Sequence, residues 1–518
     1  MLSFGTAGLR GPVRPGPDGM NVETVTRATA GLAAWLAANG CAGGTVIVGR
    51  DARHGSEDFA TATGEVLAAA GFDVVALPDP GPTPLVAFAC RSLRAVAGVM
   101  ITASHNPPAD NGYKVYLEGG AQLVTPADRE IEQAIAATVG TEIARAAVEP
   151  DVRADRVRAA YLDRLRDRFG PDGSGPAVRI ALTPMHGVGG GLALDALRRA
   201  GFDDVHVVGE QFAPDPDFPT VAFPNPEEPG ATDLLLATAE RVGADLAIAL
   251  DPDADRCAIG VPGGGTWRML TGDETGALLG DAILTGIGRT DPAPVVASSV
   301  VSGTLMHELA IARGADARRT LTGFKWLVRA GEPLAYAYEE ALGHCVDPAA
   351  VRDKDGVSAA LACALIARSW ADRGGIVAAL RELTLRYGRH VTAQRAVRLD
   401  EPQQQAAVMS GLRETPPRSL AGFAVEMTDY AARTDGLRTD GVELTGTDTS
   451  GATLRVFVRP SGTEPKLKYY GQLTVPSDHR TGPPEAISVN GVRGVSGDDP
   501  VRTLDRVLDE VTRRGPNR

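Results

Sequence analysis

A short polar segment, TASHNP, follows an apolar run that is typical of a buried strand and offers a hydroxyl that could do chemistry. It places Ser104 next to His105, and Lys114 follows downstream. An imidazole and an ammonium near one hydroxyl could move a proton and stabilise charge, which nucleophilic catalysis requires. An ordinary turn is the alternative, because asparagine and proline are common turn residues. Because His105 and Lys114 are close to it in the sequence, we favour the interpretation that Ser104 is a nucleophile. It would lie at the carboxyl edge of a sheet, where α/β folds bind ligands.

A second polar segment, DPDADR, comes directly after the apolar run ADLAIAL. Asp251, Asp253 and Asp255 occupy alternate positions, so an extended loop would turn three hard oxygen ligands toward one point. Mg²⁺ or a similar cation is therefore expected, and a solvated acidic turn is the alternative. The downstream glutamate of a calcium-binding EF-hand loop is missing. Arg256 could hold an anionic oxygen opposite the metal.

A third polar segment, RPSGTEPKLK, follows the predicted strand ATLRVFV. Arg459, Ser461, Gly462 and Thr463 offer a guanidinium, two hydroxyls and an unobstructed amide, which suits a set of phosphate oxygens. A plain hairpin turn is the alternative. We expect this loop to bind phosphate.

Two further segments carry weaker signals. FGTAGLRG places Arg10 in a glycine-rich turn, which could approach a phosphate or could simply begin a domain. YEEALGH places Glu339, Glu340 and His344 near a glycine, where carboxylates could accept hydrogen bonds from sugar hydroxyls. Pairs of glutamates more often lie on a solvated surface, so this segment indicates a binding site only in combination with the three polar segments above.

The elements that must position these segments alternate between apolar runs and helical patterns from about residue 25 to about residue 385. The alternation predicts α/β domains with three layers and mixed sheets, and the tail, with antiparallel strand patterns and an amphipathic last helix, predicts a smaller α+β domain. We expect domain boundaries at 1–150, 151–270, 271–385 and 386–518.

Composition limits the class of protein. A net charge of −13 and a pI near 5.2 disfavour nucleic-acid binding. The same net charge would repel an anionic substrate, so local arginines and lysines must attract it. The five scattered cysteines form no CxxC pair and suit a reducing compartment. No apolar run approaches the roughly 20 residues that span a bilayer. We expect a cytoplasmic protein without a membrane or nucleic-acid partner, and we predict no particular oligomeric state.

Taken together, TASHNP, DPDADR and RPSGTEP resemble the motifs of the α-D-phosphohexomutase superfamily, in that order and over nearly the whole chain. The chain is most similar to the subgroup of phosphoglucomutase-2-like enzymes and actinobacterial phosphomannomutases. The segments that carry this narrower similarity are GRDARHGS, TPMHGVGG, DFPTVAFPNPEE, TLTGFKW and DKDGVSAA.

The resemblance implies three α/β domains and a smaller fourth domain around a central cleft. It implies that Ser104 is a phosphoserine and that, with the three aspartates of DPDADR, it binds Mg²⁺. It also implies roles for the following residues: Arg10, His105, Lys114 and Arg256 around the transfer, and Lys325, Glu340, His344 and the RPSGT residues at the substrate.

The implied activity is that of a phosphohexomutase, which interconverts hexose 1-phosphate and hexose 6-phosphate, with mannose or glucose as the sugar and hexose 1,6-bisphosphate as intermediate and activator. A phosphopentomutase acting on ribose phosphates, a sugar-phosphate phosphatase and a non-catalytic sugar-phosphate-binding protein are the rivals. Leu342 stands where many hexomutases carry a small hydroxyl residue, which bears on sugar identity. Either His105 or Lys114 could handle the hydroxyl proton. The chain also begins almost on its first motif, whereas close relatives usually carry an additional N-terminal helical segment.

Overall fold

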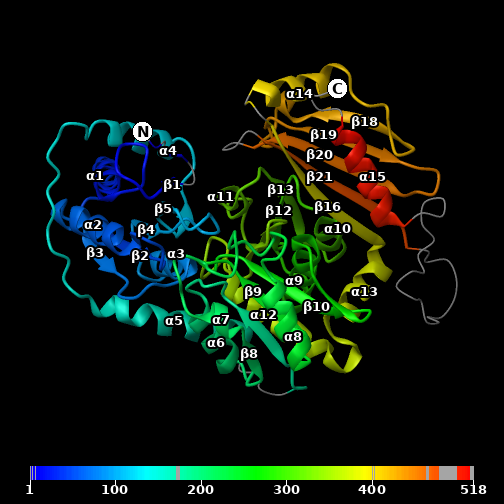
Figure 1. The fold of residues 1–518 in the computed structure, drawn as a ribbon, viewed down its shortest axis with the longest axis horizontal. Helices are drawn as coiled ribbons and strands as arrows, with labels where there is room; N and C mark the ends of the chain where they lie inside the picture. The colour runs from blue at the N-terminus through cyan, green and yellow to red at the C-terminus, as the bar shows by residue number, and fades with distance from the viewer. Residues whose placement is uncertain are drawn as a thin grey trace. The chain divides into compact units, whose positions relative to one another are not determined.

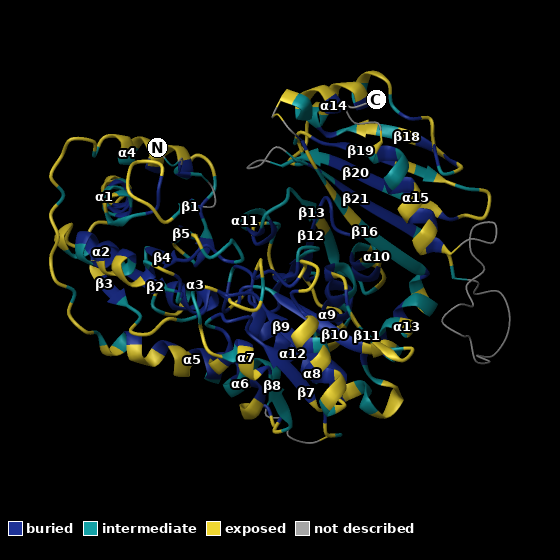
Figure 2. Cartoon of the chain, viewed as in Figure 1, coloured by how far each residue is buried: buried dark blue, intermediate teal, exposed yellow. Residues whose placement is uncertain are grey.

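The structure is a computed structural model that describes residues 2, 4, 5, 8–170, 175–399, 401, 403–461, 466–477 and 499–513. The chain divides into two compact units. Unit 1 comprises Met1–Thr275 and Gly331–Val377, and unit 2 comprises Gly276–Ala330 and Ala378–Arg518. Figure 1 shows the elements of both units, and Figure 2 shows that their sheets are largely buried while the outer faces of many helices are exposed.

The first α/β domain lies in unit 1. Its elements are β1 (Leu9–Pro12), α1 (Val22–Ala38), β2 (Thr45–Arg50), α2 (Ser56–Ala69), β3 (Asp73–Ala76), α3 (Thr83–Ser92), β4 (Ala97–Ile101), β5 (Asp110–Leu117), β6 (Ala121–Gln122) and α4 (Ala127–Ala136). The strand order is β1-β5-β4-β2-β3, with β6 paired to β5. β2 is parallel to β3 and β4, whereas β5 is antiparallel to β4 and β1. Every residue of β4 is buried, as expected for a strand covered on both faces.

The second α/β domain also lies in unit 1. Its elements are α5 (Val152–Phe169), β7 (Ile180–Thr183), α6 (Gly190–Arg199), β8 (Val205–Val207), α7 (Gly209–Phe212), α8 (Asp233–Val242), β9 (Leu246–Leu250), β10 (Cys257–Gly263) and β11 (Thr266–Met269). The strand order is β11-β10-β9-β7-β8. β7 is parallel to β8 and β9, and β10 is antiparallel to β9 and β11.

The third α/β domain contributes elements to both units. They are α9 (Gly272–Ile287), β12 (Val295–Ser299), α10 (Leu305–Ala312), β13 (Asp316–Thr320), α11 (Phe324–Leu327), β14 (Leu334–Glu339), β15 (Gly343–Cys345), α12 (Gly356–Trp370), η1 (Ala371–Arg373) and α13 (Gly375–Tyr387). Within unit 2, β12 and β13 pair in parallel. Within unit 1, β14 and β15 form an antiparallel hairpin, and α12 packs against α6, β9 and β10.

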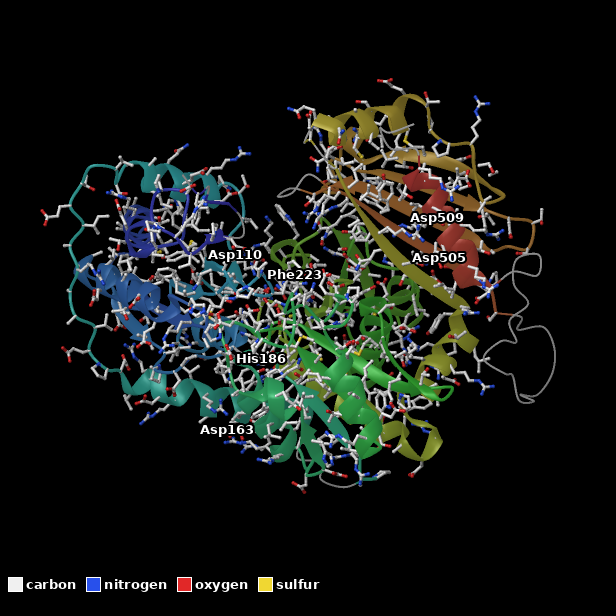
Figure 3. The ribbon with its side chains drawn as sticks, viewed as in Figure 1. Asp110, Asp163, His186, Phe223, Asp505 and Asp509 are labelled. Atoms are coloured by element: carbon white, nitrogen blue, oxygen red, sulfur yellow. The ribbon has the colours of Figure 1, made fainter. Side chains whose placement is uncertain are left out.

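The C-terminal domain lies in unit 2 and is rich in β-strands. Its elements are β16 (Arg389–Arg398), α14 (Gln403–Glu414), β17 (Ser419–Leu420), β18 (Phe423–Asp429), η2 (Tyr430–Ala432), β19 (Val442–Thr447), β20 (Thr453–Pro460), β21 (Lys466–Val475) and α15 (Pro500–Thr512). The sheet is antiparallel, in the order β16-β21-β20-β19-β18-β17. α15 buries its apolar stripe on this sheet, and Arg395 of β16 pairs with Asp505 and Asp509 of the helix (Figure 3).

The predicted fold class is confirmed: three α/β domains with mixed sheets precede a C-terminal β-rich domain. The mixed sheets also determine how the two polar segments are held. The segments 102–109 and 251–256 follow the ends of β4 and β9, each parallel to one neighbour, and each segment leads to an antiparallel strand, β5 or β10. A direct antiparallel return needs only a short loop, so both polar segments are held tightly between two strands. Among the described residues, no helix is long and apolar enough to cross a membrane.

Candidate active site

Ser104 lies at the tip of the loop between β4 and β5, which we call the serine loop (residues 102–109). Its Oγ is 3.1 Å from Nδ1 of His105 and donates a hydrogen bond of 3.0 Å to Oδ2 of Asp251. Its backbone φ of 53° is in the left-handed region, and its amide donates to the Thr102 hydroxyl at 2.9 Å. The loop therefore presents the hydroxyl toward an imidazole and a carboxylate at the cost of a strained backbone.

Arg53 holds the serine loop in this conformation. Its guanidinium donates hydrogen bonds to the main-chain carbonyls of Ser104, at 2.7 Å, and of Asn106 and Pro107. It is only 4% exposed, and its Nε lies 3.4 Å from a carboxylate oxygen of Asp51. Sequence reasoning did not assign Arg53 a role in the site. The available signal was that GRDARHGS, like the other polar segments, follows directly on a buried strand.

The three aspartates lie in the loop between β9 and β10, which we call the metal loop (residues 251–256). Asp251, Asp253 and Asp255 are at most 1% exposed, and one carboxylate oxygen of each lies within 4.8 Å of the others. Oδ1 of Asp253 and Oδ1 of Asp255 are buried, and neither has a hydrogen-bond partner among the described residues. Buried oxygens without a donor suit a divalent cation, so these residues fit the predicted magnesium site.

Three segments from elsewhere in unit 1 support the metal loop. Thr83 and Val188 donate their amide N–H groups to carbonyls of the loop, at 2.9 and 2.8 Å. A Cβ at Gly187 or at Gly356 would come within 2.4 Å of the loop backbone, so only glycine permits this close approach. The motifs TPMHGVGG and DKDGVSAA thus carry glycines because the metal loop packs directly on their backbone.

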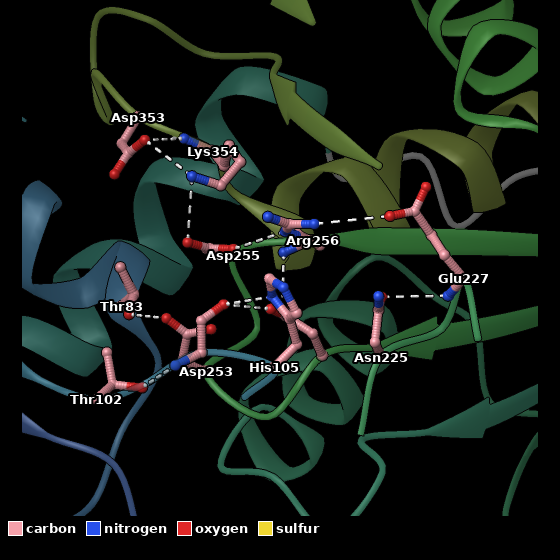
Figure 4. A network of polar contacts seen from close by, with 12 residues as sticks. Thr83, Thr102, His105, Asn225, Glu227, Asp253, Asp255, Arg256, Asp353 and Lys354 are labelled. Atoms are coloured by element: carbon pink, nitrogen blue, oxygen red, sulfur yellow. Dashed lines mark hydrogen bonds and ion pairs between the residues drawn. The ribbon is translucent and has the colours of Figure 1, made fainter. Parts of the chain in front are cut away.

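Two lysines compensate the negative charge of the metal loop. Nζ of Lys114 lies 2.6 Å from Oδ2 of Asp253 and 3.0 Å from Oδ2 of Asp255. Nζ of Lys354 lies 3.3 Å from the same oxygen of Asp255 (Figure 4). Burial alone would raise the pKa of Asp253, but the Lys114 ammonium outweighs it and holds that pKa below its ordinary value. Burial and the other two carboxylates raise the pKa of Asp251.

Lys354 was missed by sequence reasoning, although a compositional signal for it exists. The chain has five lysines, and four of them, Lys114, Lys325, Lys466 and Lys468, lie in segments that were assigned to the site. The fifth is Lys354. Because arginine carries almost all other positive charge in this chain, the lysine in DKDGVSAA was a signal that a site residue could stand there.

Two arginines flank the serine and metal loops. Arg10, on β1, donates a hydrogen bond of 3.0 Å to Oδ1 of Asn106. Arg256 lies 3.8 Å from carboxylate oxygens of both Asp255 and Glu227. Burial and the charges of Arg256 and Arg10 lower the pKa of His105 well below its ordinary value. The site thus contains a neutral imidazole between two guanidinium groups, which would attract an anionic substrate.

The YEEALGH segment lies partly beside this cluster. Gly343 forms a β-bridge with Arg256, and burial raises the pKa of Glu339 to about 7. Glu340 is only partly buried. His344, in contrast, is 0% exposed, and its Nδ1 lies 3.0 Å from the Tyr336 hydroxyl. The structure therefore brings the start of this segment to the cluster and places His344 in the interior.

Leu342 is also buried, at 3% exposure, and it packs in the core of the second domain with Met185 and Ala258. Its φ of 62° turns the chain between β14 and β15. At this position the side chain anchors the loop in the core.

The remaining predicted residues lie in unit 2. Arg459, at the end of β20, donates a hydrogen bond to the hydroxyl of Thr322, three residues before Lys325 of α11. The amide of Ser461 donates to the carbonyl of Lys466 at 2.8 Å. Gly462 and Thr463 lie outside the described residues. Unit 2 thus brings Arg459 to the TGFK segment, while unit 1 gathers Ser104, His105, Lys114, Arg10, Arg256 and the three aspartates.

Comparisons with known proteins agree with this arrangement. Residues 1–140, 159–264 and 271–384 match domains I, II and III of the family described as phosphoglucomutase/phosphomannomutase, alpha/beta/alpha domains. A probable phosphomannomutase of Haemophilus influenzae is 38% identical over 462 residues, which cover 87% of this chain and 92% of the relative.

Two other relatives extend the comparison. A human phosphopentomutase is 32% identical over 529 residues, covering 92% of this chain and 85% of the relative. The crystal structure of a putative phosphomannomutase of Thermus thermophilus superposes with a TM-score of 0.73 at 24% identity, covers 99% of both chains and shows the shared fold. The phosphoglucomutase-2-like subgroup stays a prediction. The chain belongs to the phosphoglucomutase/phosphomannomutase family, and it is an enzyme of the phosphosugar mutase type, an intramolecular phosphotransferase.

Proposed function

We propose that the enzyme interconverts hexose 1-phosphates and hexose 6-phosphates through a phosphorylated Ser104 and a hexose 1,6-bisphosphate intermediate. One observation carries the proposal: the Oγ of Ser104 lies within 3.1 Å of both His105 Nδ1 and Asp251 Oδ2, at the edge of a buried aspartate triad. A buried hydroxyl with an imidazole on one side and a cation site on the other is the arrangement that a phosphoryl carrier needs.

In the forward half-reaction, the bond between phosphorus and Ser104 Oγ breaks, and a bond to the free hydroxyl oxygen of the sugar forms. The hydroxyl proton must leave as this bond forms. We assign its transfer to His105, because Nδ1 lies 3.1 Å from Ser104 Oγ, the leaving oxygen, so the ring can take the sugar proton and return it to Oγ as the phosphoryl group departs. The ammonium of Lys114, in contrast, is tied to Asp253 and Asp255. The bisphosphate then turns, and its other phosphoryl group returns to Ser104.

Asp251, Asp253, Asp255 and phosphorylated Ser104 would hold Mg²⁺. When bound, the cation offsets charge on the transferring phosphoryl group and polarises the leaving oxygen. Lys114 and Lys354 keep two of the aspartates charged and oriented whether or not the cation is present. Arg10 and Arg256 lie at the same loops and supply guanidinium groups to the phosphoryl oxygens.

We assign the non-reacting phosphate to Arg459, Ser461, Gly462, Thr463 and Lys325. The contact between Arg459 and Thr322 supports this assignment, because it holds the guanidinium beside the TGFK segment. Binding the distal phosphate requires positive charge and a fixed geometry but no proton transfer.

The sugar is proposed to be glucose or mannose. Glu340 and His344 would read hydroxyls at carbons 3 and 4, which the two sugars share. For His344, this role requires the β14–β15 hairpin to open, because the ring is fully buried. Leu342 offers no hydroxyl and is itself buried, so it makes no polar contact that could distinguish the carbon 2 epimers. We therefore expect kcat/KM values for glucose 1-phosphate and mannose 1-phosphate within roughly a hundredfold of each other.

A phosphopentomutase is the second candidate, and the similarity to the human phosphopentomutase favours it. A ribose phosphate has a smaller ring and would hold its two phosphates at a different separation from those of a hexose phosphate. We expect slower turnover of ribose 1-phosphate for that reason.

A coupled assay tests the proposal. Glucose, mannose, ribose and glucosamine 1-phosphates are compared with Mg²⁺ and a catalytic amount of glucose 1,6-bisphosphate. The 6-phosphate of glucose or mannose should form fastest. Preference for ribose 1-phosphate would establish the pentose alternative, and release of inorganic phosphate without 6-phosphate would identify a phosphatase.

Intact-mass analysis supplies the second test. Wild-type enzyme incubated with glucose 1,6-bisphosphate should gain one phosphate that maps to Ser104, and Ser104→Ala should gain none and lose turnover by orders of magnitude. Comparable turnover of Ser104→Ala would exclude a phosphoserine intermediate.

A further inference from the structure

A cavity of about 450 Å³ lies in unit 1 at the C-terminal end of α3. Its wall combines apolar side chains, among them Phe88 and Ala350, with the arginines Arg91, Arg94 and Arg164. No residue assigned above to phosphoryl transfer lines it. The volume is within the range of about 300–1,000 Å³ that small-molecule sites occupy.

Positive charge on the cavity wall is only partly compensated. Arg91 donates hydrogen bonds to the carbonyls of Ala349 and Gly119, at 2.9 and 2.8 Å, and in the described part of the chain no carboxylate pairs with it. Burial, followed by the nearby charge of Arg352, lowers the pKa of Arg91. Its guanidinium is thus fixed by main-chain oxygens and makes no ion pair in the described part of the chain, while Glu332 and Asp347 act on it without direct contact.

The other charged side chains of the cavity wall do not cancel its excess of positive charge. Arg164 is already neutralised, because it makes two hydrogen bonds to Asp347, at 2.7 and 2.8 Å. Arg94 is exposed at the wall with a left-handed φ of 52°. Glu118 is the one carboxylate among the lining residues. Two arginines therefore face a single glutamate, on a chain whose net charge is −13.

The cavity and the metal loop are joined by continuous segments. α3 is 10 residues long, about 15 Å at 1.5 Å per residue. Thr83 at its start donates from its amide and its hydroxyl to Asp253, and Arg91 at its end lines the cavity. The segment that places Ala350 on the cavity wall also leads, four residues on, to Lys354 at Asp255. A displacement of either segment at the cavity would thus shift Thr83 or Lys354, the residues that contact Asp253 and Asp255 of the metal loop.

We propose that this cavity binds a small organic anion, a phosphate or carboxylate carried on an apolar body, and that its occupancy changes the affinity of the aspartate triad for Mg²⁺. The anionic group would pair with Arg91 and Arg94, and the apolar body would contact Phe88 and Ala350. The coupling part rests on the proposed magnesium site, whereas the binding part does not.

Calorimetric titration of the full-length enzyme with phenylphosphonate tests the binding, with benzyl alcohol as the neutral counterpart. Arg94→Ala should weaken phenylphosphonate binding roughly three- to tenfold, and Glu118→Gln should tighten it by a similar factor, because each changes one unit charge at a partly exposed site. Arg198→Ala removes an exposed arginine of α6, away from the cavity wall, and should change nothing. Equal affinities of wild type, Arg94→Ala and Glu118→Gln would overturn the proposal, as would equal binding of benzyl alcohol.

Titration of Mg²⁺ with and without saturating phenylphosphonate tests the coupling. The Mg²⁺ affinity of the wild type should change at least about threefold, and the phenylphosphonate affinity should change by the same factor when Mg²⁺ is saturating. In Arg94→Ala the same change should require a roughly three- to tenfold higher concentration of phenylphosphonate. An effect on Mg²⁺ affinity whose dependence on phenylphosphonate is the same in wild type and Arg94→Ala would assign the phosphonate to the active site and overturn the coupling. If no Mg²⁺ binds under any condition, the proposed magnesium site has failed, and the phenylphosphonate titrations still decide whether the cavity binds anions.

Discussion

Replacing Lys114 with methionine should destabilise the metal-free enzyme strongly. Lys114 is 7% exposed, and its Nζ lies 2.6 and 3.0 Å from carboxylates of Asp253 and Asp255, which are themselves fully buried. Methionine keeps most of the length and apolar stem of lysine but removes the ammonium. Two buried carboxylates then lose their nearest counter-charge, and the remaining ion pairs, with Lys354 at 3.3 Å and Arg256 at 3.8 Å, involve Asp255 alone.

Breaking a buried ion pair by removing one partner typically costs about 3–5 kcal/mol, because the other charge stays buried and uncompensated. For a unit whose free energy of unfolding falls by about 3 kcal/mol per molar urea, this loss would lower the unfolding midpoint by about 1–1.7 M. A divalent cation on the triad would supply the missing positive charge. Millimolar Mg²⁺ should therefore recover a large part of the loss in Lys114→Met and add less to the wild type.

The assay is urea unfolding followed by tryptophan fluorescence, in EDTA and in Mg²⁺, for wild type, Lys114→Met and the double variant Lys114→Met/Asp253→Asn. The double variant removes the uncompensated charge of Asp253 and should be more stable in EDTA than Lys114→Met alone, with a coupling energy of about 1–3 kcal/mol. A midpoint for Lys114→Met in EDTA that equals the wild type would refute the assignment of Lys114 as the counter-ion of the triad.

The remaining predictions concern the metal, the distal phosphate and the pH dependence. Asp253→Asn removes one charged ligand, so its Mg²⁺ affinity should fall by about tenfold or more in a calorimetric titration, and EDTA should inactivate the wild type; full turnover in metal-free buffer would exclude the metal assignment. Arg459→Lys should raise KM by about tenfold with little change in kcat, because an ammonium cannot grip phosphate with two parallel hydrogen bonds, and an unchanged KM would make the loop structural. Burial raises the pKa of Glu339 to about 7, so ionisation of this side chain costs the folded state stability as the pH rises through that value. Glu339→Gln should therefore be more stable than wild type at about pH 8, by at most about 3 kcal/mol, with little difference near pH 5; equal urea midpoints at both pH values would contradict this.

Much of the fold could be predicted because the apolar periodicity is strong and the residues that end each helix or strand are easy to recognise. The segment VETVTRATAGLAAWLAANG predicts a helix that Gly40 closes, and the structure has α1 there, which ends at Ala38 with Gly40 at a φ of 80°. The run ADLAIAL is β9, with every residue from Leu246 to Leu250 buried. These segments were predictable because one pattern of side chains satisfies both local propensity and burial.

The antiparallel returns were not predictable from the same signals. β5 follows the serine loop directly, but its sequence DNGYKVYL begins with turn-forming residues and contains a lysine, which is unusual in a buried strand. Lys114 is tolerated there because its partners, Asp253 and Asp255, come from a distant part of the chain. Local patterns cannot report such a pair.

The same reason explains which site residues were found. Ser104 and the aspartates stand in compact motifs whose chemistry is visible in the sequence alone. Arg53 acts on main-chain carbonyls, and no pattern of residue types marks a carbonyl. His344 was assigned to the substrate from its motif, and its complete burial depends on the aromatic rings of Tyr336 and Tyr338 that stack beside it.

The left-handed backbone of Ser104 sets the requirements of the fold against those of the reaction. At a φ of 53°, any residue with a Cβ costs about 1–2 kcal/mol relative to glycine, so glycine is the residue that the fold alone would select at this position. Variants chosen only for resistance to heat or protease would drift toward Ser104→Gly and lose the proposed phosphoryl carrier. A stability screen of this enzyme must therefore exclude position 104 from randomisation or include a selection for turnover, because here the more stable chain would be the inactive one.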